Sequence, residues 1–326
     1  ILGGLLAAAQ PICDWDTLDA VRPQLEKAAP AGSAKVVPFQ LLVSFSDPKF
    51  LHDVTRFRRT TLPPTAPRPP LRADDGRIRL AYLSADFHTH ATAWLMADLF
   101  ERHDRSRFEM IGVSFGAETG GAMRERLEQG FDRFLEVQAM PDADVAALLR
   151  QMQVDIAIDL KGYTAGARAG IFAHRAAPVQ VCYLGYPATM AVDFQDYVLG
   201  DPVVLPHDQQ PFWSEKIVHL PECYQVNDPG RPHEAPLSRA EAGLPDNAFV
   251  FASFNNHFKI DRPVFESWMR LLAATPGSLL WLLDDSANDQ LRDHARAHGI
   301  DPARLIFAPR LDIAKHLRRL PCADLM

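Results

Sequence analysis

Short apolar runs alternate with helix-like segments along residues 76–224 of this chain. The apolar runs are typical of buried strands, and they span 78–84, 108–115, 131–137, 154–160, 179–184 and 197–200. Between them, apolar residues recur three and four positions apart, which predicts helices over 92–102, 122–128, 142–152 and 165–173. Asp142 is the predicted N-cap of the third of these helices. Strands that alternate with helices predict right-handed βαβ units and a parallel sheet.

The same alternation begins again at residue 249. It predicts strands over 249–254, 278–283 and 305–308, and helices over 263–274, 289–298 and 313–320. Residues 323–326 resemble the first residues of one more strand, so we expect the second sheet to be incomplete in this chain.

The remaining segments suggest how the chain is divided. Leu18, Val21 and Leu25 recur at helical spacing, so residues 1–70 are predicted to be a helical lead-in that ends in a proline-rich linker. This lead-in is expected to pack on the domain that follows it, or to cap helical repeats upstream. The predicted division is 1–70, a first α/β domain over 71–224, a linker over 225–246 and a second α/β domain over 247–326.

Composition and charge exclude several classes of protein. The 326 residues suffice for about two domains, and the net charge of −7 makes the chain a poor general binder of nucleic-acid backbones. No apolar run reaches the roughly 18 residues that a membrane helix needs. The four cysteines form no CxxC pair, so reduced thiols and a cytoplasmic location are expected, with no membrane partner.

The first candidate for chemistry is the turn that follows the strand 78–84. His88 and His90 share one side of an extended segment, and alternation places Asp86 on that side too. A His-x-His pair can bind a metal, but no further ligand is evident. A single histidine that accepts a proton or binds a substrate is favoured, and a histidine that only caps the helix is the alternative.

Two further turns follow strands of the first predicted sheet. In the first, Lys161, Gly162 and Thr164 form either an anion-facing turn with Thr164 as a helix cap or an ordinary βα turn. In the second, Gly185 and Pro187 predict a rigid turn, from which Tyr186 could stack on a sugar or base.

The last candidate turn follows the first strand of the second sheet. Lys259 would present an ammonium group just before a helix, which suits a phosphate or diphosphate, and Asn256 offers an amide nearby. The alternative is a solvated surface charge.

Taken together, these turns resemble a known family. The segments SADFHTHATAWL, DLKGYTAGAR, APVQVCYLGYPATM, FASFNNHFKID and SLLWLL occur in the order found in the O-linked N-acetylglucosamine (O-GlcNAc) transferases. The resemblance covers about residues 76–326. It implies a fold of GT-B type, in which two Rossmann-like domains face a cleft and follow a helical segment linked to tetratricopeptide repeats. It also implies inverting, metal-independent transfer of N-acetylglucosamine from UDP-GlcNAc to Ser or Thr hydroxyls of a protein, without a cofactor.

The resemblance also implies roles for individual residues. His90 matches the active-site histidine, Lys259 the lysine that contacts the diphosphate, and Asn256 a donor-binding glutamine of animal members. Thr164, Gly185 and Pro187 match segments on the sugar and acceptor side. Lys161 stands where the family has Asn, and Tyr186 and Asp86 are weaker site candidates. A GT-B-type epimerase and a non-catalytic UDP-sugar-binding protein remain as alternatives.

Overall fold

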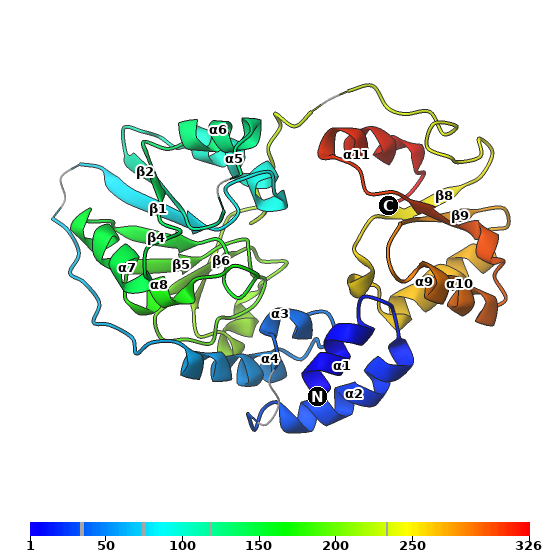
Figure 1. Cartoon of the computed structure of the whole chain (residues 1–326), viewed down its shortest axis with the longest axis horizontal. Coiled ribbons are helices and arrows are strands. Elements are labelled where there is room, and N and C mark those ends of the chain that lie inside the picture. The colour runs from blue at the N-terminus through cyan, green and yellow to red at the C-terminus, as the bar shows by residue number, and fades with distance from the viewer. Residues whose placement is uncertain (33–35, 74–75, 118, 233) are drawn as a thin grey trace. The chain divides into compact units, whose positions relative to one another are not determined.

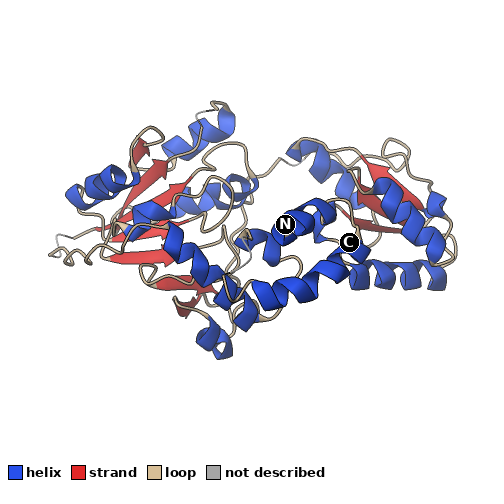
Figure 2. Ribbon diagram, turned by 60° about the horizontal axis from the view of Figure 1, so that its bottom comes forward, coloured by secondary structure: helices blue, strands red, loops and turns tan. Residues whose placement is uncertain are grey.

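The computed structural model describes residues 1–32, 36–73, 76–117, 119–232 and 234–326 (Figure 1). Two compact units divide the chain. One consists of residues 46–230, and the other combines residues 1–45 with residues 231–326. Each unit contains one parallel sheet with helices around it (Figure 2).

The unit of residues 46–230 is built on a seven-stranded sheet in the order β3-β2-β1-β4-β5-β6-β7. All neighbouring strands are parallel, and they are β1 (Ile78–Ser84), β2 (Phe108–Ser114), β3 (Arg133–Glu136), β4 (Ile156–Asp159), β5 (Val179–Cys182), β6 (Tyr197–Gly200) and β7 (Lys216–His219). The chain moves from β1 outward to β3, and then returns to place β4 on the other side of β1. The strand order therefore reverses between β1 and β4, where ligands of open α/β sheets bind.

The strands and main helices of this unit lie where the hydrophobic pattern predicts them, within a few residues. Its helices are α4 (Pro48–Thr55), η1 (Arg56–Thr61), α5 (Ala91–Arg102), α6 (Ala122–Gln129), α7 (Asp142–Gln151), α8 (Ala169–Ala173) and η2 (His207–Phe212). The edge strand β7 was not predicted. Its four residues include only one buried residue, Ile217, so it carries little hydrophobic signal.

One prediction at the start of α7 is wrong. The N-cap of this helix is Pro141, and Asp142 is its first helical residue. The Asp142 carboxylate accepts a hydrogen bond from Arg168 Nε at 2.7 Å, and Arg168 also donates to the carbonyl of Val137 at 2.9 Å. The side chain that was expected to cap α7 therefore holds the turn before α8.

Aromatic packing forms much of the core beside the first turn. Phe100 is 1% exposed, and its ring centroid lies 4.7 Å from that of Phe131 and 6.0 Å from that of Phe87. Burying one such ring stabilises a fold by roughly 1.5–3 kcal/mol. Phe87 belongs to the turn that follows β1, so this turn is anchored in the core.

The other unit contains a three-stranded parallel sheet in the order β10-β9-β8. Its strands are β8 (Val250–Ser253), β9 (Leu279–Leu283) and β10 (Leu305–Ala308), and its helices in residues 231–326 are η3 (His257–Lys259), α9 (Arg262–Ala274), α10 (Asn288–Ala297), η4 (Pro302–Arg304), α11 (Ile313–Arg319) and η5 (Leu320–Cys322). Leu325 pairs with Phe251 in a parallel bridge, and its carbonyl accepts from Ala252 N at 2.8 Å. At the position of the expected further strand, the structure thus has a single isolated bridge to β8.

The N-terminal helices belong to this second unit and not to the domain that follows them in sequence. They are α1 (Leu2–Ala9), α2 (Trp15–Ala28) and α3 (Pro38–Leu41). Trp15 is 1% exposed, and its ring stacks on that of His294 in α10 at 4.2 Å and lies 5.2 Å from that of Phe265 in α9. The expectation that the lead-in packs on the next domain is therefore corrected for residues 1–45. Their apolar face is covered by helices about 250 residues further along the chain.

Candidate functional site

The turns after β1, β4 and β5 lie at the carboxyl ends of adjacent strands in the sheet of residues 46–230. The structure therefore brings together the candidates Asp86 and His90, Lys161 and Thr164, and Gly185 to Pro187 at one sheet edge. Because β1 and β4 flank the reversal in strand order, this edge is the expected ligand position of the sheet. Asn256 and Lys259 lie in the other compact unit.

A buried ion pair links the turn after β1 to the turn after β4. Lys161 Nζ lies 2.6 Å from Asp86 Oδ2, and the two side chains are 6% and 12% exposed. Asp159, at the end of β4, accepts hydrogen bonds from the backbone N–H groups of Lys161 at 2.8 Å and Gly162 at 3.0 Å. Burial raises the pKa of Asp159, although these hydrogen bonds and Lys161 oppose the rise. The Lys161 ammonium thus already has a carboxylate partner within the protein.

His90 is the N-cap of α5. Its Nδ1 accepts a hydrogen bond from the backbone N–H of Thr92 at 3.2 Å, while Asp86 Oδ2 lies 3.6 Å from the same nitrogen. Burial lowers the pKa of His90; Lys161 and His88 lower it further, and Asp86 raises it. At neutral pH the ring is therefore uncharged, and since Nδ1 accepts, the proton is on Nε2. The ring is 41% exposed and can present this N–H to a ligand.

Two residues from elsewhere in the same unit hold the turn that carries Asp86 and His90. Arg124 of α6 is 4% exposed and donates to the carbonyl of Phe87 at 3.2 Å and to Ser114 Oγ at 3.0 Å. Gly116 lies directly against the turn, since a Cβ at that position would be 1.9 Å from the carbonyl oxygen of Ala85. Both contacts restrict the path of the backbone between β1 and α5.

Glycines allow the turns after β4 and β5 to pack against each other. Gly162 has φ +52°, and a Cβ there would lie 2.4 Å from Tyr186 Cβ. A Cβ on Gly185 would lie 1.8 Å from the carbonyl oxygen of Leu160. Tyr186 is only 8% exposed and packs edge-on against Tyr163, with ring centroids 5.7 Å apart. Its ring therefore supports the turn and leaves little face for the predicted stacking on a sugar or base.

Thr164 and Pro187 lie at the same edge. Thr164 Oγ1 donates to the carbonyl of Lys161 at 2.8 Å, and the N-cap of α8 is Arg168, so the predicted capping role of Thr164 is wrong. Thr164 instead closes the turn after β4. Pro187 is exposed at the end of the turn after β5.

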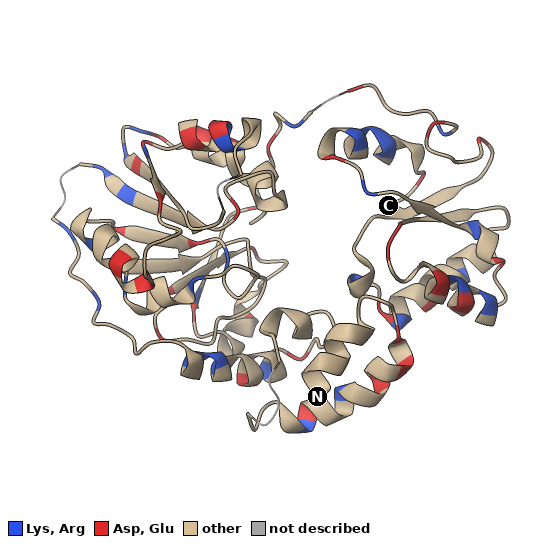
Figure 3. Ribbon diagram, in the orientation of Figure 1, with Lys and Arg blue, Asp and Glu red and all other residues tan. Residues whose placement is uncertain are grey.

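In the other unit, Lys259 lies in η3, just after β8. Its backbone N–H donates to the carbonyl of Asn256 at 3.0 Å, which closes the turn. The side chain is exposed, and within the described ranges its ammonium group has neither a hydrogen bond nor an ion pair. Acidic and basic residues are otherwise interspersed in both units (Figure 3). Two basic residues of α11, for example, are paired with acidic ones: Lys315 lies 3.2 Å from Asp312, and Arg318 lies 3.4 Å from Glu234.

The backbone around η3 is held by residues from elsewhere in the unit. Trp15 Nε1 donates to the carbonyl of Ile260 at 3.1 Å, and Cys13 Sγ lies 3.5 Å from the carbonyl of His257. His257 is 1% exposed; its Nδ1 accepts from Ala287 N at 3.2 Å, and its Nε2 lies 2.8 Å from the carbonyl of Leu283. Burial lowers the pKa of His257, so the ring is neutral with its proton on Nε2.

Comparison with known proteins now decides the family. The model of glycosyl transferase family 41 matches residues 63–233 and 230–326, which is most of the chain. The chain belongs to glycosyl transferase family 41. It is 32% identical to the probable UDP-N-acetylglucosamine–peptide N-acetylglucosaminyltransferase SEC of Arabidopsis thaliana, over 99% of this chain and 36% of that protein.

Other family 41 relatives agree with this assignment. The UDP-N-acetylglucosamine–peptide N-acetylglucosaminyltransferase of Caenorhabditis elegans is 25% identical over 76% of this chain and 32% of its own length. A solved structure of a lysine-to-methionine mutant of the Thermobaculum terrenum O-GlcNAc transferase matches with a TM-score of 0.79 at 26% identity, covering 96% of this chain and 60% of that one. The chain spans about a third of the length of these curated relatives. The fold is accordingly of GT-B type, with two Rossmann-like parallel sheets.

Three residues that support the candidate turns of the two units were missed in the sequence analysis. Arg124 and Trp15 support the two turns, and neither carries a signal because each acts on a distant segment. Arg310 lies two residues after the end of β10 and donates to Asn256 Oδ1 at 2.9 Å and to Asp285 Oδ2 at 2.7 Å. A basic residue just beyond a strand of a parallel sheet is the signal that could have revealed Arg310.

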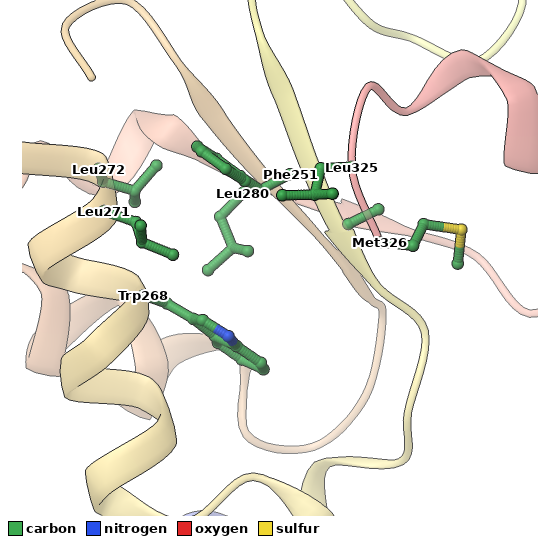
Figure 4. Close-up of a pocket in the computed structure, with 8 residues that line it drawn as sticks. Phe251, Trp268, Leu271, Leu272, Leu280, Leu325 and Met326 are labelled. Atoms are coloured by element: carbon green, nitrogen blue, oxygen red, sulfur yellow. The ribbon is translucent and has the colours of Figure 1, made fainter. Parts of the chain in front are cut away.

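The described residues also bear on metal binding, on membrane crossing and on a pocket outside the candidate turns. No group of three or more His, Cys, Asp or Glu side chains there is placed to hold a metal ion. Among the same residues, none of the helices combines the length and apolar character that crossing a membrane requires. A pocket beside β8 and α9 has an almost wholly apolar lining (Figure 4), formed by Phe251, Ala252, Trp268, Leu271, Leu272, Leu280, Leu325 and Met326. Such a lining offers no charged group for a nucleotide.

Proposed function

We propose that this protein is an inverting glycosyltransferase that moves N-acetylglucosamine from UDP-GlcNAc to Ser or Thr hydroxyls of proteins. The observation that carries this proposal is the 32% identity, over 99% of the chain, to a plant protein named as a UDP-N-acetylglucosamine–peptide N-acetylglucosaminyltransferase. The exposed ammonium of Lys259, in η3 after the Rossmann-like strand β8 and without a partner among the described residues, agrees with it, because such a site needs a cation for the diphosphate.

In this proposal Lys259 stabilises the negative charge that develops on the leaving diphosphate. Charge stabilisation of this kind is usually the largest single contribution to such catalysis. Asn256, held by Arg310, supports the donor beside Lys259. Lys259 would do what a divalent ion does in other transferases, so the reaction requires neither a metal nor a cofactor. Thr164, Gly185 and Pro187 would line the sugar and acceptor side.

His90 would position a substrate and would not deprotonate the acceptor. A neutral imidazole whose Nδ1 accepts from Thr92 already has a proton on Nε2. The exposed side of the ring is therefore a hydrogen-bond donor to an acceptor or sugar oxygen. A phosphate oxygen of the donor could take the proton of the attacking hydroxyl instead.

The partners follow from the same reaction. They are a protein or peptide with Ser or Thr, and a UDP-sugar, with no nucleic acid and no membrane. A reducing, cytoplasmic setting fits the free thiols of the four cysteines.

The test uses the full-length protein and two measurements. Calorimetry with UDP-GlcNAc and competing UDP-sugars, with and without a chelator, should show binding of UDP-GlcNAc that the chelator leaves unchanged. Incubation with UDP-GlcNAc should then label a Ser- or Thr-containing peptide but not its Ala counterpart. Formation of a new UDP-sugar without any peptide would point to an epimerase, and binding without transfer or hydrolysis would point to a UDP-sugar-binding protein. Either result would overturn the proposal.

A further inference from the structure

We propose that Lys161 is a positioning residue that, by neutralising Asp86, keeps His90 uncharged with its proton on Nε2. The proposal rests on the function proposed above, since it concerns how His90 meets a substrate.

The geometry gives one carboxylate oxygen two competing partners. Asp86 Oδ2 lies 2.6 Å from Lys161 Nζ and 3.6 Å from His90 Nδ1. The first distance is that of a strong, charge-assisted hydrogen bond, whereas the second is too long for a hydrogen bond. Lys161 therefore satisfies Asp86, and His90 Nδ1 stays free to accept from the backbone of Thr92.

Burial makes this competition consequential. Only 12% of the Asp86 side chain is exposed. A carboxylate that is poorly solvated and has no positively charged or hydrogen-bonding partner raises the free energy of the folded state, so Asp86 needs such a partner. Without the Lys161 ammonium, the nearest group that can compensate is His90. A proton bound at His90 Nδ1 would make this nitrogen a donor to Asp86, so it could no longer accept from Thr92 N. The ring would leave its capping position on α5 and gain a charge.

The other charged or titratable groups that face His90 do not replace Lys161. His88, whose ring centroid lies 5.7 Å from that of His90, opposes a second positive charge in the turn. The amino-terminal end of α5, which His90 caps, also disfavours a cation. Asp86 alone favours protonation of His90, and Lys161 is the group that cancels it.

The experiment measures His90 directly. In the full protein labelled with ¹⁵N-histidine and free of UDP-sugar, ¹⁵N shifts report the tautomer and pKa of each ring, and His90→Gln assigns the His90 signals. Lys161→Met removes the charge and keeps a side chain of similar length. In this variant the titration midpoint of the His90 ring should move to higher pH, which corresponds to several-fold tighter proton binding. A proton should also appear on His90 Nδ1. Lys161→Arg, which keeps the charge, should retain the wild-type shifts.

A second pair of variants keeps the test decisive if Lys161→Met does not fold. Asp86→Asn should move the His90 midpoint to lower pH, and Asp86→Asn combined with Lys161→Met should restore the proton on Nε2. Unchanged His90 shifts in Lys161→Met, or equal effects of the Met and Arg variants, would overturn the proposal. In a transfer assay, the acidic limb of kcat should move to higher pH in Lys161→Met. Because the shifts need no turnover, they test Lys161 even if the protein proves not to be a transferase.

Discussion

Each sheet has a candidate turn directly after its first strand along the chain, β1 or β8, and the two turns are held in different ways, although β1 is an inner strand of its sheet and β8 is an edge strand. Charged residues of the same unit hold the turn after β1: Lys161, in the turn after β4, pairs with Asp86, and Arg124 of α6 donates to the Phe87 carbonyl. Two uncharged side chains, Trp15 of the N-terminal helices and the buried His257, support the turn after β8, together with Arg310, which donates to Asn256 Oδ1. In the first turn Asp86 is therefore compensated by Lys161, whereas in the second turn the ammonium of Lys259 has no charged partner among the described residues.

The contrast suggests that the two turns present different kinds of group to a ligand. A turn that compensates its own charges can present a neutral donor such as His90 without attracting a proton. A turn whose exposed lysine has no carboxylate partner among the described residues can present the ammonium group of that lysine to an anionic ligand. The following variants each remove or disturb one of the contacts or groups that distinguish the two turns.

The largest expected effect comes from removing the exposed ammonium group of Lys259. Lys259→Ala should lower kcat for transfer from UDP-GlcNAc by roughly 10²–10³-fold, the usual loss when a group that stabilises transition-state charge is removed. Steady-state kinetics of the full-length protein would measure it. Lys27→Ala, at an exposed lysine of α2 in the same unit, is the control and should leave kcat unchanged. Equal activity of both variants would show that Lys259 is only a solvated charge.

The second effect disturbs the turn after β1 by steric means. Gly116→Ala places a Cβ 1.9 Å from the carbonyl oxygen of Ala85, so the turn must shift. Overpacking of this kind typically lowers the free energy of unfolding by about 1–3 kcal/mol, which denaturant unfolding would measure. Gly4→Ala is the control, because a Cβ there meets nothing within 4 Å and Ala favours the helix α1. If both variants unfold at the same denaturant concentration, the close approach of Gly116 to the turn does not restrict it.

The third effect tests the neutral support of the turn after β8. Trp15→Phe keeps an aromatic ring but removes the donor to the Ile260 carbonyl, a loss of roughly 1–3 kcal/mol when a buried acceptor is left unsatisfied. We expect lower stability and a several-fold higher KM for UDP-GlcNAc, measured by unfolding and by kinetics. Trp281→Phe is a matched control, since this tryptophan is also 1% exposed and its Nε1 has no partner among the described residues. A KM that changes equally in both variants would indicate a general packing effect.

Local pattern predicted most of the sheets, because buried strands carry their signal in their own residues. The bounds of β1, β6 and β10 agree with the predicted ranges to the residue. The candidate residues were also found locally, since each follows a strand.

The remaining features depend on residues that are distant in sequence. The Lys161–Asp86 pair requires β4 to lie beside β1, and no local pattern specifies strand order. Within the second unit, the packing of residues 1–45 on residues 231–326 rests on contacts such as that of Trp15 with Ile260. Tyr186 was expected to meet a ligand, but its burial follows from the close approach of Gly162, which only the three-dimensional structure reveals.

The smallest expected effect is a pH dependence of the free energy of unfolding. It originates in the uncharged ring of His257, which supports the turn after β8. Because burial lowers the pKa of His257 in the folded state, the unfolded chain binds more protons once the pH falls below the ordinary histidine pKa of about 6.5. Stability should therefore be constant above that pH from this source and should decline as the pH falls below it. Urea unfolding between pH 8 and pH 5 would measure the decline.

His257→Gln separates this contribution from those of other histidines. The variant should be less stable than wild type at pH 8, because Gln cannot reproduce both hydrogen bonds of the ring with Leu283 and Ala287. It should nevertheless lose less stability on acidification, because residue 257 no longer titrates. His90→Gln should also flatten the curve, since burial lowers the pKa of His90 too, but it should leave the turn after β8 intact. Parallel pH curves for wild type and His257→Gln would show that His257 does not couple protonation to the support of the Lys259 turn.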